Sequence, residues 1–208
     1  MTKLIIIAGP QSSGKTTTLN YLKKKHPEWH FVDEVNPASI TGKKDFGALN
    51  TSAQLERKII EEDIKNIEKI SRGHKFVLLE CGIFHYAYAR YFLYKKIADE
   101  FFQKYLGAHH GLDPFVLFIH TKPDASWERR KGKYVKRLKN KGISEPDIME
   151  KHLTKYREMI ETLYPFWLDC YKKVPFPKMT IPNTVKSKGV FLKEADKVIQ
   201  SLLYRKFS

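Results

Sequence analysis

Residues suited to binding phosphate stand near the start of the chain, in the segment GPQSSGKTT at positions 9–17. Gly9, Gly14, Lys15 and Thr16 fit the P-loop spacing G-x-x-x-x-G-K-[ST]. Glycines let backbone N–H groups close around phosphate oxygens, the lysine supplies a positive charge to the β- and γ-phosphates, and the threonine offers a hydroxyl to Mg²⁺. The segment therefore predicts a nucleotide phosphate site, whose expected contacts are Gly9, Gln11, Ser12, Ser13, Gly14, Lys15, Thr16 and Thr17.

A strand must lead into this loop and a helix must leave it. Residues 3–9 read KLIIIAG, a run too short and too β-branched for a helix, so we expect the first strand there. A helix is expected from Lys15 to about Lys25, ending before Pro27. The positive end of that helix would then face the bound phosphate.

Two further short strands end in carboxylates, which suit the part of such a site that binds Mg²⁺ and the acceptor. A strand at residues 29–32 ends in Asp33 and Glu34, and a strand at residues 74–79 ends in Glu80. Acids at the carboxyl ends of parallel strands face the crevice where α/β proteins bind ligands. We expect Glu80 to act on Mg²⁺ with the P-loop threonine, and Asp33 or Glu34 to act as a general base or to position Mg²⁺ through water. A helix cap or turn is an equal alternative for Asp33.

The formal net charge of +15 predicts acidic partners, and the basic excess is dense only at residues 129–141. The tetrapeptide TKPD at residues 121–124 fits the [NT]KxD form with which GTPases hold guanine, yet the chain lacks the DxxG segment of a GTPase. We therefore favour a helix that begins at the Pro-Asp pair of TKPD. It would carry a lid at about residues 124–145, in which Arg129 and Arg130 clamp phosphate.

The remaining pattern predicts one domain, residues 1–208, in which strands alternate with helices. A long helix is expected from residue 51 to Gly73, capped by Thr51 or Ser52, after a mobile loop at residues 36–50. The further expected elements are strands at 115–120 and 178–181 and helices at 190–204 and at 146–174, the last kinked or split by Pro165. This order indicates a three-layer α/β/α P-loop NTPase fold with a mainly parallel five-stranded sheet and a helical lid.

Gln54, Arg57 and Arg90 are candidates for contact with an acceptor. Gln54 and Arg57 are i, i+3 neighbours on one helix face, where an amide and a guanidinium suit a base and a phosphate, although a solvated face fits equally well. Arg90 lies in the aromatic segment CGIFHYAYARYFLY, whose rings suit core packing, with one or two able to face a nucleobase.

The composition argues against membrane and disulfide-rich classes. No apolar run is long enough to span a membrane and residues 3–9 do not read as a signal peptide, so we expect a cytoplasmic protein. Cys81 and Cys170 lack metal-ligand spacing and are expected as reduced core residues. His109 and His110 are expected in a solvated loop.

With these pieces assembled, the sequence resembles the thymidylate kinase and deoxynucleoside kinase group of P-loop kinases over nearly its whole length. Glu80 looks like the acid of that group's Glu/Asp-Arg motif. The resemblance implies that Glu34 draws the proton from the substrate hydroxyl and that Gln54 reads the base. It also implies that Arg129 and Arg130 stabilise the transferring phosphoryl group.

The predicted function is that of an ATP- and Mg²⁺-dependent kinase acting on a nucleoside or a nucleoside monophosphate. A nucleoside acceptor needs an acid at Glu34, whereas a nucleotide acceptor needs basic groups, for which Arg57 and Arg90 are candidates. Cys81 stands where the resembled group has an arginine for the substrate side, which leaves the acceptor open. The alternatives are a GTP- or ATP-dependent switch, an RNA-binding ATPase and a polynucleotide 5′-hydroxyl kinase. Nucleic acid is a less favoured partner than a small molecule, and a homodimer stays open.

Overall fold

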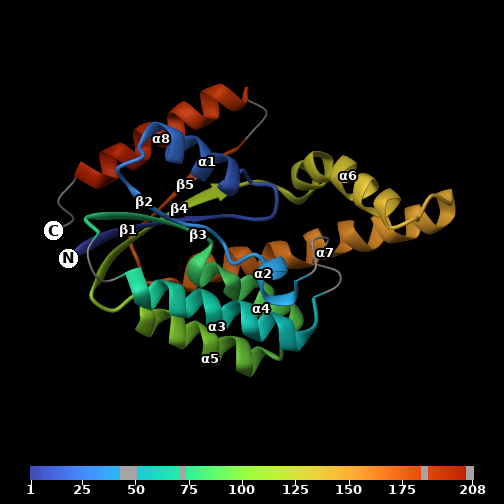
Figure 1. The fold of residues 1–208 in the computed structure, drawn as a ribbon, viewed down its shortest axis with the longest axis horizontal. Helices are drawn as coiled ribbons and strands as arrows, with labels where there is room; N and C mark the ends of the chain where they lie inside the picture. Colours follow the sequence, from blue (N-terminus) through green and yellow to red (C-terminus); the bar gives the residue numbers. More distant parts are fainter. Residues whose placement is uncertain (43–50, 71–73, 184–186, 205–208) are drawn as a thin grey trace.

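The computed structural model of the protein describes residues 1–42, 51–70, 74–183 and 187–204. Its centre is a parallel five-stranded sheet in the strand order β2-β3-β1-β4-β5 (Figure 1). The strands are β1 (Thr2–Ala8), β2 (His30–Val32), β3 (Phe76–Glu80), β4 (Leu112–His120) and β5 (Lys178–Pro182). The predicted α/β fold class is confirmed, and each strand pair in this sheet is parallel.

Helices cover both faces of the sheet and give the expected three layers (Figure 1). One face carries α1 (Lys15–Lys25) and α8 (Lys188–Tyr204). The opposite face carries α3 (Ala53–Ile70), α4 (Tyr86–Phe92), α5 (Lys95–Ala108) and α7 (Pro146–Lys173). The chain also forms α2 (Pro37–Thr41), the 3-10 turn η2 (Gly82–His85) and α6 (Pro123–Asn140), and η2 packs on the face that carries α3, α4, α5 and α7.

Two apolar clusters, one on each face of the sheet, hold the layers together. Ile5 and Ile7 of β1 pack with the residues of α1 and α8, whereas Leu4 and Ile6 pack with those of α3, α4, α5 and α7. This alternation follows from the two-residue period of a strand. Because both faces are covered, the centre of β1 is apolar on both sides, as its sequence IIIA requires.

The register of the sheet places the candidate site residues along one edge. Ile7 of β1 pairs with Glu80 of β3, and Val32 of β2 pairs with Leu79. The chain leaves β1 into the P-loop and leaves β2 into Asp33 and the residues after it. Both segments therefore meet beside the carboxyl end of β3, where open parallel sheets bind ligands.

α6 and the first half of α7 form an arm that extends beyond the sheet (Figure 1). Tyr134 of α6 and Tyr156 of α7 stack with ring centroids 3.8 Å apart. Arg157 Nη2 of α7 lies 3.3 Å from Asp124 Oδ1 in the first turn of α6. The segment expected as a helical lid is thus a helix that is held against α7.

Pro165 does not divide α7 into two helices. Of the two expected outcomes, a kink or a split, the split is wrong, because α7 runs as one helix through this residue. Leu163 and Trp167, on either side of the proline, are buried in the core, and the Tyr164 hydroxyl lies 2.7 Å from His120 Nε2. This packing holds the helix together where one backbone hydrogen bond is missing.

Two helices and one histidine also depart from the expectation. α2 lies within the expected loop, where the Asn36 side chain accepts a hydrogen bond from the Ala38 N–H at 3.0 Å, and residues 43–50 of that loop fall outside the described residues. α5 is a separate helix after the aromatic segment. His109 is buried at the end of α5, with Nδ1 2.6 Å from the Tyr105 carbonyl, and is not in a solvated loop.

The expected helix start near residue 51 is confirmed, because the Ser52 hydroxyl accepts a hydrogen bond from the Leu55 N–H at 3.1 Å. α3 ends at Ile70, and the expected stop at Gly73 lies outside the described residues. Among the helices that the structure describes, none combines the length and the apolar character needed to cross a membrane.

Candidate active site

The P-loop connects β1 to α1 through backbone conformations that suit glycine. Gly9 has φ +144°, and a Cβ atom there would lie 2.3 Å from the Ile119 carbonyl oxygen of β4. Gly14, just before α1, has φ +107°. A side chain at either position would strain the loop, so both glycines are required for its shape.

Lys15 lies at the mouth of this loop and is almost fully buried. Its Nζ donates to the Gly9 carbonyl at 2.9 Å and lies 5.0 Å from the centroid of the Trp167 ring. Carbonyl dipoles and an aromatic face both favour a cation there. A phosphate entering the loop would meet this charge where little water screens it.

Thr16 and Glu80 form the oxygen pair expected for a magnesium ion. The Thr16 hydroxyl donates to Glu80 Oε1 at 2.5 Å. Burial and the charge of Glu34 raise the pKa of Glu80, while Lys15 and the Thr16 hydrogen bond act in the opposite direction. Mg²⁺ prefers a few oxygen ligands beside substrate phosphates, so these two residues fit that ion.

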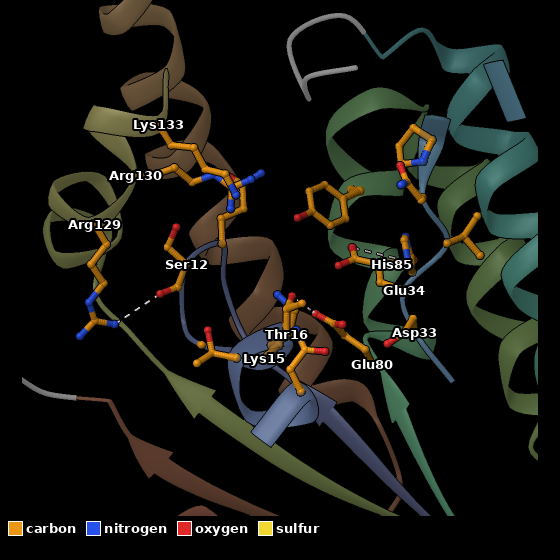
Figure 2. A pocket seen from close by; sticks show the side chains of 18 of the residues that line it. Ser12, Lys15, Thr16, Asp33, Glu34, Glu80, His85, Arg129, Arg130 and Lys133 are labelled. Atoms are coloured by element: carbon orange, nitrogen blue, oxygen red, sulfur yellow. Dashed lines mark hydrogen bonds and ion pairs between the residues drawn. The ribbon is translucent and has the colours of Figure 1, made fainter. Parts of the chain in front are cut away.

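A cavity of about 1150 Å³ opens over the P-loop, and its two sides carry opposite charges. In Figure 2, Arg129, Arg130 and Lys133 stand on one side, and Asp33, Glu34 and His85 stand on the other. Lys15, Thr16 and Glu80 lie between the two sides. The cavity can therefore hold an anion over the loop and a second, less anionic group against the acidic side.

The predicted phosphate contacts divide into two groups. The cavity lining includes Gln11, Ser12, Gly14, Lys15, Thr16 and Thr17. Gly9 and Ser13 are not part of that lining. The Ser13 carbonyl instead accepts a hydrogen bond from Asn183 Nδ2 at 2.6 Å, which joins the loop to the residue after β5.

On the acidic side, Glu34 and Asp33 have different surroundings. Glu34 Oε1 lies 3.8 Å from Nε2 of the buried His85. Asp33 Oδ2 is 2.6 Å from the Lys23 ammonium of α1, and the Asp33 side chain is 59% exposed. An exposed ion pair leaves Asp33 less free than Glu34 to take a proton from a bound hydroxyl. Both residues line the cavity, and Glu34 has the better surroundings for a base.

Glu56 is a cavity-lining carboxyl that the sequence reasoning did not single out. It lies in the first turn of α3 and is 3% exposed, with no hydrogen-bond partner for Oε1 in the described part of the chain. Burial, reinforced by Glu34 and opposed by His85, raises the pKa of Glu56 to about 7. Glu56 can therefore present either a neutral or a charged carboxyl near physiological pH.

Asp63 lies two turns further along α3 and is also buried. The Tyr105 hydroxyl donates to Asp63 Oδ2 at 2.9 Å, and burial raises the pKa of this carboxyl. Glu56 and Asp63 share a helix face with Ile60 and Ile67, at a spacing of four, three and four residues. This in-phase placement of two acids within an apolar stripe was the sequence signal that both side chains are buried.

The basic side is built by α6, as the lid interpretation expects. Arg129 donates to the Ser12 carbonyl at 3.3 Å and to the Asn183 carbonyl at 2.9 Å. The Ser126 hydroxyl donates to the Gln11 carbonyl, so the first turns of α6 are joined to the P-loop. Arg130 lies with its guanidinium carbon 5.6 Å from the Tyr134 ring centroid and lines the cavity. Both predicted arginines therefore lie at the P-loop.

The TKPD segment begins α6 and lies outside the lining of this cavity. Pro123 occupies the first turn of the helix, and Asp124 is its first-turn acid. A helix start of this kind uses the fixed φ of proline and places a negative charge at the positive helix end. This geometry supports the lid interpretation of TKPD over the guanine interpretation.

Gln54 and Arg57, expected at the substrate, are placed elsewhere. Both are exposed side chains of α3 and neither belongs to the cavity lining, which instead takes Glu56 and Ile59 from this helix. The structure therefore favours the solvated face that the sequence left open for these two residues. The cause is rotation about the helix axis, since Glu56 lies between them in sequence but on the buried face.

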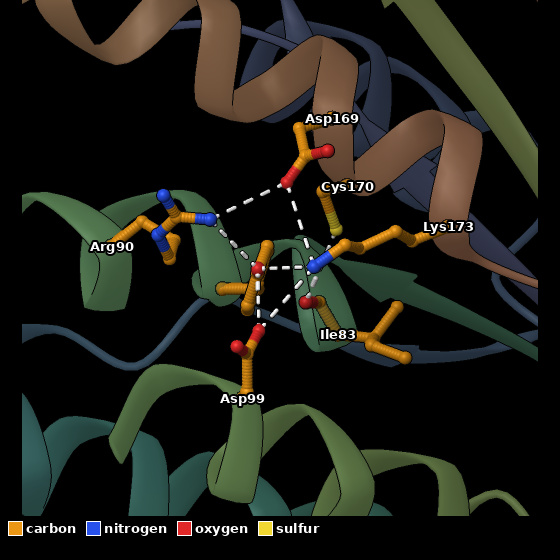
Figure 3. Close-up of polar contacts among 7 residues, drawn as sticks. Ile83, Arg90, Asp99, Asp169, Cys170 and Lys173 are labelled. Atoms are coloured by element: carbon orange, nitrogen blue, oxygen red, sulfur yellow. Dashed lines mark hydrogen bonds and ion pairs between the residues drawn. The ribbon is translucent and has the colours of Figure 1, made fainter. Parts of the chain in front are cut away.

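Arg90 is also placed outside the cavity, in a polar network between α4, α5 and α7 (Figure 3). Its Nη1 lies 3.1 Å from the Tyr86 hydroxyl and 3.5 Å from Asp169 Oδ2. The Tyr86 hydroxyl donates to Asp99 Oδ1 at 2.8 Å, and Lys173 Nζ donates to Tyr86 at 2.7 Å. Because Nη1 contacts both Tyr86 and Asp169, the structure favours a packing role for Arg90 over the expected substrate contact.

Comparisons with known proteins identify the family and the fold of the chain. A family model described as an AAA domain matches residues 4–143, which is more than half of the chain. No curated protein matches the sequence. Solved structures match over almost the whole chain, at low sequence identity.

A deoxyadenosine kinase from M. mycoides with dCMP and dCDP has 16% identity and a TM-score of 0.59, and the match covers 95% of this chain and 99% of that one. YorR from Bacillus subtilis, in complex with phosphorylated GDP, has 12% identity and a TM-score of 0.57, covering 98% and 99%. Shikimate kinase from Acinetobacter baumannii, in complex with shikimate, has 15% identity and a TM-score of 0.51, covering 99% and 97%. Similarity at this level establishes the fold alone, and the fold is that of P-loop kinases.

The family model matches residues 4–143, which include the P-loop, and the chain therefore belongs to the AAA domain family.

Proposed function

We propose that this protein is an ATP- and Mg²⁺-dependent kinase that transfers the γ-phosphoryl group to a hydroxyl of a nucleoside. The observation that carries the proposal is the single cavity in which the P-loop, the Thr16–Glu80 pair and Glu34 all meet. Donor and acceptor groups would be held together over the loop, and such positioning supplies much of the catalysis in phosphoryl transfer.

The distribution of charge in the cavity restricts which class of acceptor it can bind. A nucleoside monophosphate needs a cation at its own phosphate, but Arg57 and Arg90 lie outside the cavity, and the described cations in its lining stand by the P-loop and the lid. The acceptor side presents Glu34 and Glu56. An uncharged hydroxyl compound fits these acids, whereas a phosphate would be repelled. The fold shared with a deoxyadenosine kinase is consistent with a nucleoside.

In the proposed reaction, the acceptor oxygen attacks the γ-phosphorus while the bond from this atom to the β,γ-bridging oxygen breaks. The hydroxyl proton passes to the Glu34 carboxylate, and ADP leaves. Lys15 and the loop N–H groups hold the β- and γ-phosphates, while Arg129 and Arg130 neutralise charge that spreads onto the transferring group. Bound Mg²⁺, held by Thr16 and Glu80, would further neutralise the phosphate oxygens.

An acceptor panel tests this proposal. Purified protein is incubated with ATP and Mg²⁺ and with each common ribo- and deoxynucleoside or its monophosphate, and the products are identified by mass. We expect a monophosphate from at least one nucleoside and no transfer to monophosphates. Tight ATP binding without transfer to any nucleoside would contradict the proposal.

A polynucleotide 5′-hydroxyl kinase is a second candidate, and the cations Lys133 and Arg137 on the lid side of the cavity favour it. A nucleic acid would follow such a basic helix through its backbone phosphates. A short oligonucleotide with a 5′-hydroxyl therefore belongs in the panel, across a salt series. Transfer to the oligonucleotide that falls steeply with salt, with none to nucleosides, would favour this candidate.

A further inference from the structure

We propose that Glu34, Cys81 and His85 form a binding site for a transition-metal ion of the Zn²⁺ class at the acceptor end of the cavity. One carboxylate oxygen, the thiol sulfur and one imidazole nitrogen all lie within 4.8 Å of one another. Ligands of a tetrahedral zinc ion stand about 3.5 Å apart, so side-chain shifts of about 1 Å complete the set. This inference goes beyond the proposed kinase activity and does not depend on it.

His85 supplies the independent observation that a ligand is needed. It is 3% exposed, and neither ring nitrogen has a hydrogen-bond partner among the residues that the structure describes. Buried polar atoms left without partners are costly and uncommon in native proteins. The residue also lines the cavity, so the imidazole is within reach of an ion that enters there.

Cys81 is placed beside His85 by an unusual backbone. The residue has φ +71° and ψ −70°, and its N–H bonds to the Ile7 carbonyl at 3.0 Å, directly after Glu80 at the end of β3. Positive φ is strained for a residue with a side chain, and such strain concentrates at functional sites. η2 then begins at Gly82, and its last residue is His85. The turn thereby brings sulfur and imidazole to the same place.

The donor set separates this site from the magnesium pair. Thr16 and Glu80 offer oxygen alone, which suits Mg²⁺, whereas sulfur and imidazole select a softer ion such as Zn²⁺. A thiolate and a carboxylate would together balance a divalent charge. Glu34 is the partly exposed member of the set, so a fourth position would face the cavity and take water or a ligand.

The site has a consequence for the proposed reaction. Glu34 cannot serve as a metal ligand and as a free base for the acceptor hydroxyl at the same time. If the proposed kinase function holds, Zn²⁺ should inhibit transfer while leaving ATP binding intact. Metal binding itself can be measured whether or not transfer occurs, so a failure of one proposal is distinguishable from a failure of the other.

Cobalt provides a direct probe of sulfur ligation. The full-length protein, stripped of metal and reduced, is titrated with Co²⁺, and the near-ultraviolet charge-transfer band of a cobalt–thiolate bond is recorded. We expect the band to saturate at one Co²⁺ per chain and to disappear when Zn²⁺ is added. The proposal is wrong if no such band forms.

Matched variants locate the site. Cys81→Ser should remove the charge-transfer band, and His85→Asn should weaken Co²⁺ binding at least tenfold. Cys170→Ser and His110→Asn, which alter a buried cysteine and an exposed histidine elsewhere, should leave the titration unchanged. ATP binding and the thermal unfolding curve verify that each variant is folded. A band that survives Cys81→Ser and is lost in Cys170→Ser would overturn the assignment.

Discussion

The Thr16 hydroxyl donates a hydrogen bond to Glu80 Oε1 at 2.5 Å, which joins the first turn of α1 to the carboxyl end of β3. The two residues are 64 positions apart in sequence, and the parallel pairing of β1 with β3 brings them together. This contact places a hydroxyl and a carboxylate at the point where a nucleotide's terminal phosphates would lie.

Replacing either partner should weaken the use of Mg²⁺. For Thr16→Ala and Glu80→Gln we expect the Mg²⁺ concentration for half-maximal activity to rise by about tenfold or more, because a ligand or its orienting partner is lost. The measurement is the rate of ADP formation across a Mg²⁺ series. Thr41→Ala, a change in α2 outside the cavity lining, is the matched control. Unchanged Mg²⁺ dependence in both variants would exclude this pair as the ion site.

Arg130→Ala should lower kcat by about 10³-fold, since a guanidinium that stabilises the transferring phosphoryl group is worth about that much. The Arg130 side chain lines the cavity beside the Tyr134 ring, and its Nε lacks a hydrogen-bond partner among the described residues. Arg57→Ala is the control, because Arg57 is an exposed arginine of α3 outside the cavity lining. Equal kcat values for the two variants would count against the clamp.

Glu56→Gln should change the pH dependence of stability. The folded-state pKa of Glu56 is raised from 4.5 to about 7, so the unfolded chain loses this proton at lower pH than the folded chain does. Ionisation therefore favours unfolding increasingly as pH rises from about 4.5 to about 7, by about 3 kcal/mol in all. Glutamine abolishes this dependence.

The free energy of unfolding in urea, measured at pH 5 and pH 8, tests the Glu56 prediction. The free energy of unfolding of Glu56→Gln minus that of wild type should be larger at pH 8 than at pH 5, whatever this difference is at pH 5. Glu61→Gln, at an exposed position of the same helix, should show no such gain. Parallel curves for wild type and Glu56→Gln would mean that Glu56 titrates normally.

Arg90→Ala should reduce stability and leave the KM for the acceptor unchanged. The guanidinium contacts Tyr86 and Asp169 in the network of Figure 3, and losing a hydrogen bond to a charged group costs about 1.5–3 kcal/mol. Thermal unfolding and acceptor kinetics on the same preparation separate the two effects. A large rise in the KM for the acceptor with stability unchanged would contradict this prediction and support a substrate contact for Arg90.

The sequence alone predicted those site residues that lie next to one another in the chain or at the end of a recognisable strand. The loop from Gly9 to Thr17 carries its own spacing, and Glu80 is marked by an apolar strand that ends in an acid. Arg129 and Arg130 could be placed near the loop because their helix follows a strand directly. Each of these predictions required only that one strand or helix, and the residue at which it ends, be recognised in the sequence.

The acceptor side was harder because it depends on how helices are rotated and packed. Gln54 and Glu56 differ by two positions, which is about half a turn of α3, and only packing determines which of them faces inward. His85 was hidden in an aromatic run, where its burial depends on the strained turn at Cys81. Such features arise from tertiary contacts and are not marked by a pattern in the local amino-acid sequence.

The fate of the γ-phosphate of ATP tests the central claim most directly. With γ-labelled ATP, Mg²⁺ and the preferred nucleoside from the panel, the label should pass into a nucleoside monophosphate, and Lys15→Ala should abolish this transfer. Release of the label only as inorganic phosphate, at a rate that no nucleoside alters, would contradict the account and favour an ATPase or a nucleotide-dependent switch.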